Sequence, residues 1–283
     1  MKERVVFSVA EGVAFVRLNR PEKKNALDTG MFDGLREAAQ RVRDTPSLRA
    51  VVLSGEGDCF CAGLDMSTIG EMATGGLDAS SESVAEAARD LSEAGAHRAQ
   101  QVAWLWQEVP VPVIAAVQGA AYGAGIHIAL GADVRFVAPD ARIAFVEITW
   151  GLVPDLSGTQ ALRRLVPLDV AKKLIFTGEV ISGERAVALH LGTELSDDPL
   201  ESATDLARLI AGRSPDAVRA AKRLLNASAL VPVAEGLANE FRCSVALMGG
   251  TNQVEAVMAK LEQRTPRFVD PDVTVPIVDG TAE

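Results

Sequence analysis

An uncharged, apolar run at residues 111–132 constrains the fold of this chain more than any other feature. Its length is close to the roughly 20 residues of a membrane-spanning helix, so a transmembrane segment is the first alternative to weigh. Proline and glycine interrupt the run, however, and neither a basic flank nor an aromatic belt marks its ends. The pattern instead predicts a buried unit: a strand at 112–117, a turn at QGAAYGAG, a helix beginning at IHIALGA and a strand at 133–138.

Charge and cysteine content narrow the possible partners and the compartment. The 283 residues carry a net charge of −10, which argues against nucleic acid or an anionic membrane as the main partner. Cys59, Cys61 and Cys243 form neither a CxxC pair nor a metal-ligand spacing, and the N-terminus lacks an apolar signal segment. These features predict reduced thiols in a cytoplasmic protein. An anionic ligand would need positive charge or backbone N–H groups gathered at its site.

Hydrophobic periodicity predicts an α/β architecture for the first two thirds of the chain. Alternating residues at 5–10 and 13–18, joined by EG, predict a β-hairpin. An amphipathic pattern at 28–44 predicts a helix with Asp28 or Thr29 as its N-cap. The apolar residues at 49–55 predict a buried strand. The strand–helix–strand order implies a right-handed crossover. From about residue 200 onward helical patterns dominate.

Two loops rich in small residues each follow a predicted buried strand. These loops are CFCAGLDM and GAAYGAG. Small side chains let a ligand approach the backbone closely, so that a pair of N–H groups can donate to one oxygen, as in an oxyanion hole. Neither loop matches a phosphate-binding GxxxxGK[ST] or a dinucleotide-binding GxGxxG sequence, and no GxSxG motif of a serine hydrolase is present.

Two carboxylates lie eight residues apart in a largely apolar stretch, IAFVEITWGLVPDLSGTQAL. Glu147 and Asp155 would have raised pKa values if both were buried there, and they could then exchange protons. The alternative is that Glu147 is a surface helix residue and that Asp155 caps the helix predicted from SGTQALRRLV. Residue patterns alone favour the cap for Asp155.

Several separated segments together resemble one family. The chain is similar over nearly its whole length to the crotonase, or enoyl-CoA hydratase/isomerase, superfamily. The segments that carry the resemblance are VRLNRPEKKNALD, AVVLSGEGDCFCAGLDM, PVIAAVQGAAYGAGIHIALGADVRFVAPDARIAFVEITWGLVPDLSGTQAL and EAVMAKLEQRTPRF, in that order.

The resemblance implies an α/β spiral of ββα units, followed by a C-terminal α-helical region through which subunits form trimers. We therefore expect a crotonase core with an acyl-CoA site at residues 1–199 and an oligomerisation region at 200–283. It also implies homotrimers, often paired as hexamers, and an acyl-CoA thioester substrate. No metal or redox cofactor is expected, because coenzyme A is part of the substrate. The family's shared intermediate is a thioester enolate held by two backbone N–H groups.

The family's ligand-binding segments can be transferred to this sequence. The resemblance assigns the two oxyanion donors to the N–H groups of Ala62 and Ala124. Lys23 and Lys24 would supply positive charge for coenzyme A, although a solvated charge pair explains them equally well. Trp150 would narrow the acyl pocket or would simply pack in the core. The segments expected to line the coenzyme A groove also contain Ala26, Gly63, Leu64, Asp65 and Met66.

The acid–base residues depart from the hydratase pattern. Hydratases of this family use two glutamates, and Glu147 matches the second. His127 occupies the position of the first. Asp155 stands where hydratases usually have a small residue and where dienoyl-CoA isomerases have an acid. Within the family, the resemblance therefore makes Asp155 an active-site residue.

Three functions follow as hypotheses. The first is a double-bond isomerase of fatty acyl or related acyl-CoA thioesters, in which Glu147 and Asp155 move protons. The second is an enoyl-CoA hydratase, a lyase, in which His127 replaces the missing glutamate as acid or base. The third is a non-catalytic acyl-CoA binding protein, which would bind thioesters without turnover.

Overall fold

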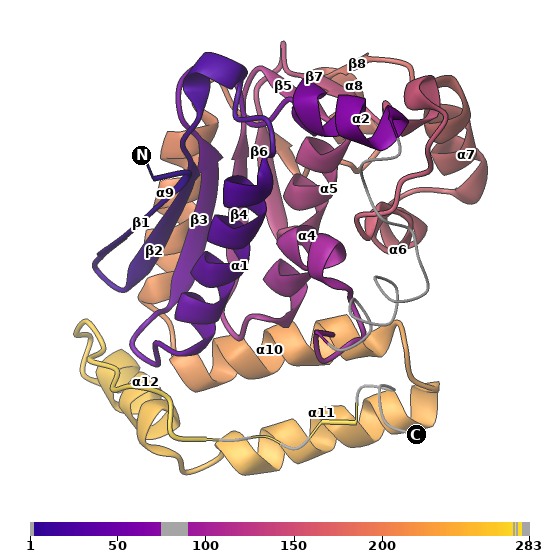
Figure 1. Cartoon of the computed structure of the whole chain (residues 1–283). Helices are drawn as coiled ribbons and strands as arrows, with labels where there is room; N and C mark the ends of the chain where they lie inside the picture. The colour runs from indigo at the N-terminus through magenta and orange to yellow at the C-terminus, as the bar shows by residue number, and fades with distance from the viewer. Residues whose placement is uncertain (1–2, 75–89, 274, 276, 279–283) are drawn as a thin grey trace.

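The computed structural model of the chain describes residues 3–74, 90–273, 275, 277 and 278. Figure 1 shows a central sheet with helices on both faces and a set of C-terminal helices below it. The mixed α/β class and the helical C-terminal region predicted from the sequence are both confirmed.

The central sheet has six strands in the order β1-β2-β3-β4-β6-β9. The first two strands form an antiparallel hairpin, and every later neighbour in the sheet is parallel. All residues of β3 and β4 are buried, as expected for parallel strands covered on both faces. The strands are β1 (Val5–Ala10), β2 (Val13–Leu18), β3 (Ala50–Gly55), β4 (Val113–Val117), β6 (Val134–Val137) and β9 (Glu194–Leu195).

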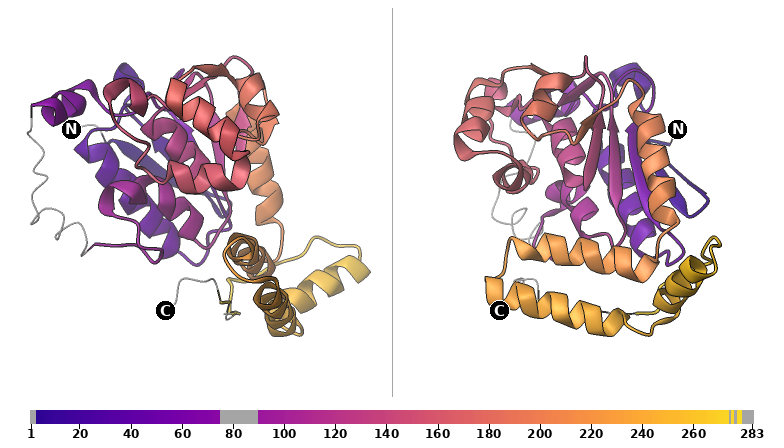
Figure 2. Two further views of the ribbon diagram at one scale, coloured as in Figure 1. Left: turned by 90° about the vertical axis from the view of Figure 1, so that its right-hand side faces the viewer. Right: turned by 180° about the vertical axis from the view of Figure 1, so that it is seen from behind.

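Helices α1, α4 and α5 cover one face of this sheet, and α9 covers the other (Figures 1 and 2). Helix α1 begins directly after Asp28, whose side chain accepts a hydrogen bond from the N–H of Met31, so Asp28 is its N-cap. On the opposite face, Ala203 and Ala207 of α9 pack against Val52 and Ile114. These helices are α1 (Thr29–Arg43), α4 (Arg98–Glu108), α5 (Ala124–Gly131) and α9 (Pro199–Ala211).

The predicted turn after β4 contains a further strand. Residues Ala120–Tyr122 form β5, which pairs in parallel with β7 (Arg142–Ala144) in a second, three-stranded sheet that also includes β8 (Ile181–Ser182). The small residues of this segment predict a turn, but a ladder partner about twenty residues away in sequence makes it a strand.

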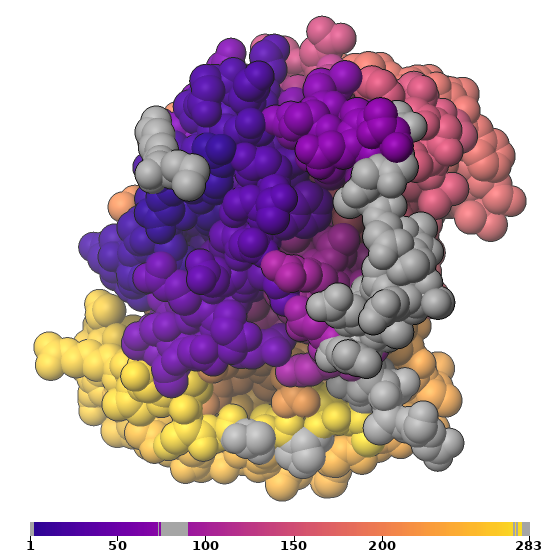
Figure 3. Space-filling view, in the orientation of Figure 1, coloured from indigo at the N-terminus to yellow at the C-terminus, as the bar shows by residue number. Residues whose placement is uncertain are grey.

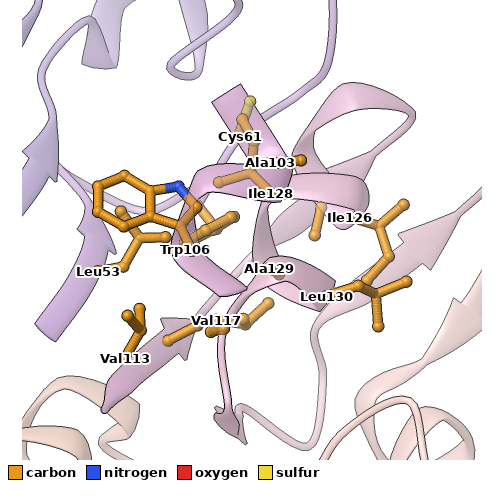
Figure 4. Packing of buried hydrophobic residues seen from close by; sticks show 14 of the residues in the cluster. Leu53, Cys61, Ala103, Trp106, Val113, Val117, Ile126, Ile128, Ala129 and Leu130 are labelled. Carbon is orange, nitrogen blue, oxygen red and sulfur yellow. The ribbon is translucent and has the colours of Figure 1, made fainter. Parts of the chain in front are cut away.

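The helix predicted at IHIALGA is confirmed as α5, which is buried in the core. Every residue of α5 is buried, and its neighbours in the core include Trp106, whose indole N–H donates to the carbonyl of Val102 at 2.9 Å. Figure 4 shows the side chains of α5 packed with those of β3, β4 and α4. Among the described residues, no helix has the length and apolarity needed to cross a membrane.

The remaining elements lie around the upper rim and in the C-terminal region. Helices α10 to α12 lie below the core and extend away from it (Figures 2 and 3). The elements are η1 (Pro21–Lys23), α2 (Met66–Ala73), η2 (Glu147–Trp150), α6 (Gly158–Leu165), α7 (Leu168–Thr177), α8 (Gly183–Ala188), α10 (Pro215–Ser228), α11 (Val233–Leu247) and α12 (Thr251–Leu261).

Candidate active site

The two small-residue loops meet at the carboxyl ends of β3 and β4. The N–H of Cys61 donates to the carbonyl of Ala120 at 2.9 Å, and the N–H of Tyr122 donates to the carbonyl of Cys61 at 3.1 Å. Gly63 has a φ of +95°, and a β-carbon there would lie 2.8 Å from the carbonyl oxygen of Tyr122. Glycine at this position therefore permits both the backbone conformation and the close contact between the loops.

The prediction that Ala62 is an oxyanion donor is wrong, because its N–H already donates to a backbone carbonyl. It donates to the carbonyl of Lys24 at 2.9 Å. Two residues further on, the N–H of Leu64 makes no hydrogen bond to any described residue, although both flanking residues are paired with Leu27. No sequence signal separates these two N–H groups, since the difference arises from pairing with a distant segment.

The second predicted donor, Ala124, keeps a free N–H. Ala124 is the first residue of α5, so its amide has no acceptor within the helix, and no hydrogen bond joins it to any described residue. A β-carbon built on Gly63 would lie 3.8 Å from this nitrogen, which places the Ala124 amide beside the loop that carries Leu64. The N–H groups of Leu64 and Ala124 are therefore free donors on the two adjoining loops.

His127 lies one turn further along α5 and is completely enclosed. Its side chain is 0% exposed, and burial lowers its pKa to about 4, so the imidazole is neutral at pH 7. The ring contacts Phe145 at a centroid distance of 5.8 Å and rests directly against Gly158. Neither ring nitrogen makes a hydrogen bond of standard geometry with a described residue, although the nearby backbone of Leu156 partly offsets the lowering of the pKa.

Glu147 begins η2 and points toward this imidazole. Its Oε1 lies 3.2 Å from Nε2 of His127, a contact that lacks hydrogen-bond geometry. Gly123 lies beside the same oxygen, and a β-carbon at Gly123 would approach it to 3.2 Å. Burial raises the pKa of Glu147, and the negative charge of Asp155 raises it further. A raised pKa in a site with free N–H donors is typical of a carboxyl that exchanges protons with a substrate.

Asp155 is not the helix cap that its residue pattern favours. Helix α6 begins at Gly158, its N-cap is Ser157, and no side chain makes a capping hydrogen bond there. The residue is solvent-exposed, yet desolvation of its carboxyl raises its pKa. The negative charge of Asp155 raises the pKa of Glu147, so the two carboxylates interact electrostatically. The alternative of Glu147 as a surface helix residue is also wrong, since its side chain is only 12% exposed.

The residues predicted to bind coenzyme A divide into exposed and internally bonded groups. Lys23 and Lys24 are exposed and form no ion pair with any described residue, which leaves both charges available. Trp150 is 46% exposed and Met66 is 64% exposed, so Trp150 is not a core residue.

Asp65, in contrast, has a structural role. Its carboxylate is buried, forms an ion pair with Arg20 and caps α2 through the N–H of Ser67. The hydrogen bonds from Ser67 and then Arg20 hold its pKa well below the usual carboxyl range. The side chain of Ala26 is buried as well, which leaves the backbone near it as the part that a ligand could contact.

A cavity of about 720 Å³ lies elsewhere in the molecule. It is bounded by α4, the end of α5, α6 and α10, and its lining includes Trp104, Arg164 and Lys222. Neither Glu147 nor Asp155 contributes to it, although Ser157 does. The two carboxylates and the two free N–H groups thus lie outside this cavity. Their chemistry, and not the volume of the cavity, identifies the candidate active site.

Comparison with known proteins identifies the family of this chain. A family model described as enoyl-CoA hydratase/isomerase matches residues 8–271. The chain belongs to the enoyl-CoA hydratase/isomerase family. The enoyl-CoA isomerase/hydratase fer4 of Mycosarcoma maydis is 31% identical over 268 residues, which cover 91% of this chain and 92% of that protein. The mitochondrial enoyl-CoA hydratase domain-containing protein 2 of Bos taurus is 34% identical over 269 residues, covering 92% and 85%.

Solved structures of this family share the fold. An enoyl-CoA hydratase from Bacillus anthracis superposes with a TM-score of 0.83 at 29% identity, covering 94% of this chain and 98% of that one. The predicted crotonase fold is therefore confirmed. An acyl-CoA substrate fits membership of the enoyl-CoA hydratase/isomerase family, whose named members include both hydratases and isomerases.

Proposed function

We propose that this protein is an acyl-CoA isomerase that moves double bonds by proton transfer, in fatty acyl or related acyl-CoA metabolism. The observation that carries the proposal is a carboxylate beside a free N–H group: Oε1 of Glu147 faces Gly123, the residue before Ala124, and the charge of Asp155 raises the pKa of Glu147. Carboxyls whose pKa values are raised by a shared site can exchange protons with a substrate. Hydratases of this family use a pair of glutamates, and in this chain His127 replaces one of the two.

In the proposed reaction Glu147 removes a proton from the carbon next to the thioester carbonyl. The negative charge moves to the thioester oxygen, where the N–H groups of Leu64 and Ala124 would donate to it. One such donor is worth about 3 kcal/mol in a transition state. Asp155, protonated at the start of the cycle, then delivers its proton to the far end of the conjugated system. After the product leaves, Glu147 loses its proton to water and the exposed Asp155 regains one from water. A 3,5-dienoyl thioester thereby becomes a 2,4-dienoyl thioester, and no other reactant is consumed.

The experiment is a panel of 2-enoyl-, 3-enoyl- and 3,5-dienoyl-CoA thioesters incubated with the protein, with identification of each product. We expect isomerised 3,5-dienoyl-CoA and little water addition to the 2-enoyl thioester. Binding of every thioester without turnover would favour the non-catalytic alternative and contradict the proposal.

One observation favours a hydratase as the second candidate. Nε2 of His127 lies 3.2 Å from Oε1 of Glu147, and neither ring nitrogen makes a hydrogen bond of standard geometry with a described residue, so the imidazole could serve as the missing acid or base. This candidate predicts that crotonyl-CoA is hydrated and that His127→Ala abolishes the hydration. Complete enclosure of the ring argues against it, because a base must reach the water that it activates.

A further inference from the structure

The free N–H of Leu64 lies on a segment that is bonded closely to residues 24–27. Ala62 donates to the carbonyl of Lys24, Leu27 donates to the carbonyl of Gly63 at 2.8 Å, and Asp65 donates to the carbonyl of Leu27 at 2.9 Å. These three bonds leave the Leu64 amide free while they fix the backbone on both sides of it. Whatever holds this pairing in register therefore sets the position of the donor.

Arg20 is at the centre of that pairing. Its guanidinium forms an ion pair with Asp65, the residue directly after Leu64. The same nitrogen, Nη1, donates to the carbonyl of Ala26 at 3.2 Å, and Nε lies 3.6 Å from the carboxylate of Asp28, the N-cap of α1. The Arg20 side chain thus links residues 62–65, the paired residues 24–27 and the start of α1.

The Arg20–Asp65 pair is protected from solvent. Their side chains are 12% and 10% exposed, so water screens the interaction little. The other oxygen of Asp65 accepts from the N–H and the hydroxyl of Ser67, at 2.8 Å and 2.7 Å. Removing the guanidinium would leave a nearly buried carboxylate unpaired beside Leu64, and the loop would have to shift to hydrate it.

We propose that Arg20 is a positioning residue that holds the Leu64 N–H in place for the enolate oxygen, acting through Asp65 without touching the substrate. This inference rests on the proposed enolate chemistry, but not on which isomer is formed. It predicts a loss of transition-state stabilisation larger than any loss of thioester binding, because a donor to the enolate oxygen matters most when charge develops on that oxygen.

The test follows exchange of the α-protons of butyryl-CoA in deuterium oxide, a reaction that requires only the enolate. We compare wild type with Arg20→Gln, Arg20→Lys and Arg20→Ala. Arg17→Gln is the control, since Arg17 lies on β2, three residues before Arg20, and pairs with Glu56 at the surface, with side chains 46% and 39% exposed. Thermal unfolding of each variant is measured alongside.

We expect Arg20→Gln to lower the exchange kcat by up to about 100-fold, as for a misplaced catalytic group, with KM changed much less. Arg20→Lys should retain the charge but recover only part of the rate, because one ammonium cannot replace both Nη1, which bonds to Asp65 and Ala26, and Nε, which faces Asp28. Added guanidinium ion should partly rescue Arg20→Ala, and Arg17→Gln should match wild type.

Unchanged exchange kcat in the Arg20 variants, or a loss carried entirely by KM, would overturn the assignment. If Arg20→Gln does not fold, Arg20→Lys decides the matter by the same two parameters. A wild type that binds butyryl-CoA but exchanges no α-proton would overturn the proposed enolate function itself, and the positioning role with it.

Discussion

At the scale of single residues, what the site can do depends on three side chains whose environments differ sharply. His127 is enclosed and neutral, Glu147 is nearly buried, and Asp155 reaches solvent. Each environment shifts a pKa in a direction that a pH titration can detect. The identity of these residues was evident from the sequence, but their burial was not, because burial depends on contacts with Gly158, Gly123 and Phe145.

His127 should make the protein less stable in mild acid. Its folded pKa of about 4 lies below the ordinary value of 6.5, so the unfolded chain binds the extra proton between these values. The free energy of unfolding should therefore fall as pH decreases from 6.5 toward 4, by roughly 3 kcal/mol from this group. Urea unfolding of wild type and His127→Gln measures this, and a pH dependence that is the same in both would contradict it.

The charge of Asp155 should be visible in the titration of Glu147. A carboxylate nearby raises the pKa of Glu147, so Asp155→Asn should lower it. The ascending limb of kcat/KM for α-proton exchange, which reports a base that must be deprotonated, should move to lower pH in that variant. Asp169→Asn on α7 serves as a control with the same change of charge. An unmoved limb in Asp155→Asn would show that the two carboxylates are not coupled.

At the scale of elements, local sequence patterns predicted those segments whose structure depends mainly on local interactions. The hairpin strands lie at 5–10 and 13–18 as the alternation predicts, and Asp28 caps α1. The small residues at 120–122 predict a turn, because the pairing of β5 with β7 is not visible locally, and Asp155 is predicted as a cap although α6 begins only at Gly158. Arg20 carried no signal in the sequence, since its role depends on partners up to 45 residues away.

The start of α6 should tolerate no side chain at Gly158. A β-carbon there would lie 2.7 to 3.0 Å from three atoms of the His127 ring, with the core behind it. Gly158→Ala should therefore destabilise the protein by about 1–3 kcal/mol and displace the imidazole from Glu147. Gly70→Ala in α2 is the control, because a β-carbon there meets nothing within 4 Å and alanine favours a helix. Equal thermal stability of the two variants would contradict this packing.

At the scale of the whole molecule, the C-terminal helices present an apolar face that is unsuited to water. Val233, Leu237, Phe241 and Val245 of α11 are spaced four residues apart and are each more than half exposed. Side chains at this spacing share one side of a helix, and a contiguous apolar patch marks an interface. This patch supports the prediction of a homotrimer or a dimer of trimers, which stays a prediction, as does the cytoplasmic location.

A single charge on that face should disrupt assembly. Phe241 is 71% exposed, so Phe241→Glu should fold normally yet dissociate the oligomer. Val9→Glu introduces the same charge at a residue that is 53% exposed on β1 and should leave assembly unchanged. Sedimentation or light scattering gives the mass directly. A wild type that is monomeric at all concentrations would contradict the predicted interface.

The proposed isomerase function depends on two carboxylates, Glu147 and Asp155, and on the reaction that they share. Conversion of 3,5-dienoyl-CoA to 2,4-dienoyl-CoA by wild type, Glu147→Gln and Asp155→Asn tests it most directly, with thioester binding measured for each. We predict turnover by wild type and losses of at least about 100-fold in kcat for both variants, with binding retained. Undiminished turnover in both variants, or no conversion by wild type, would contradict the proposed mechanism.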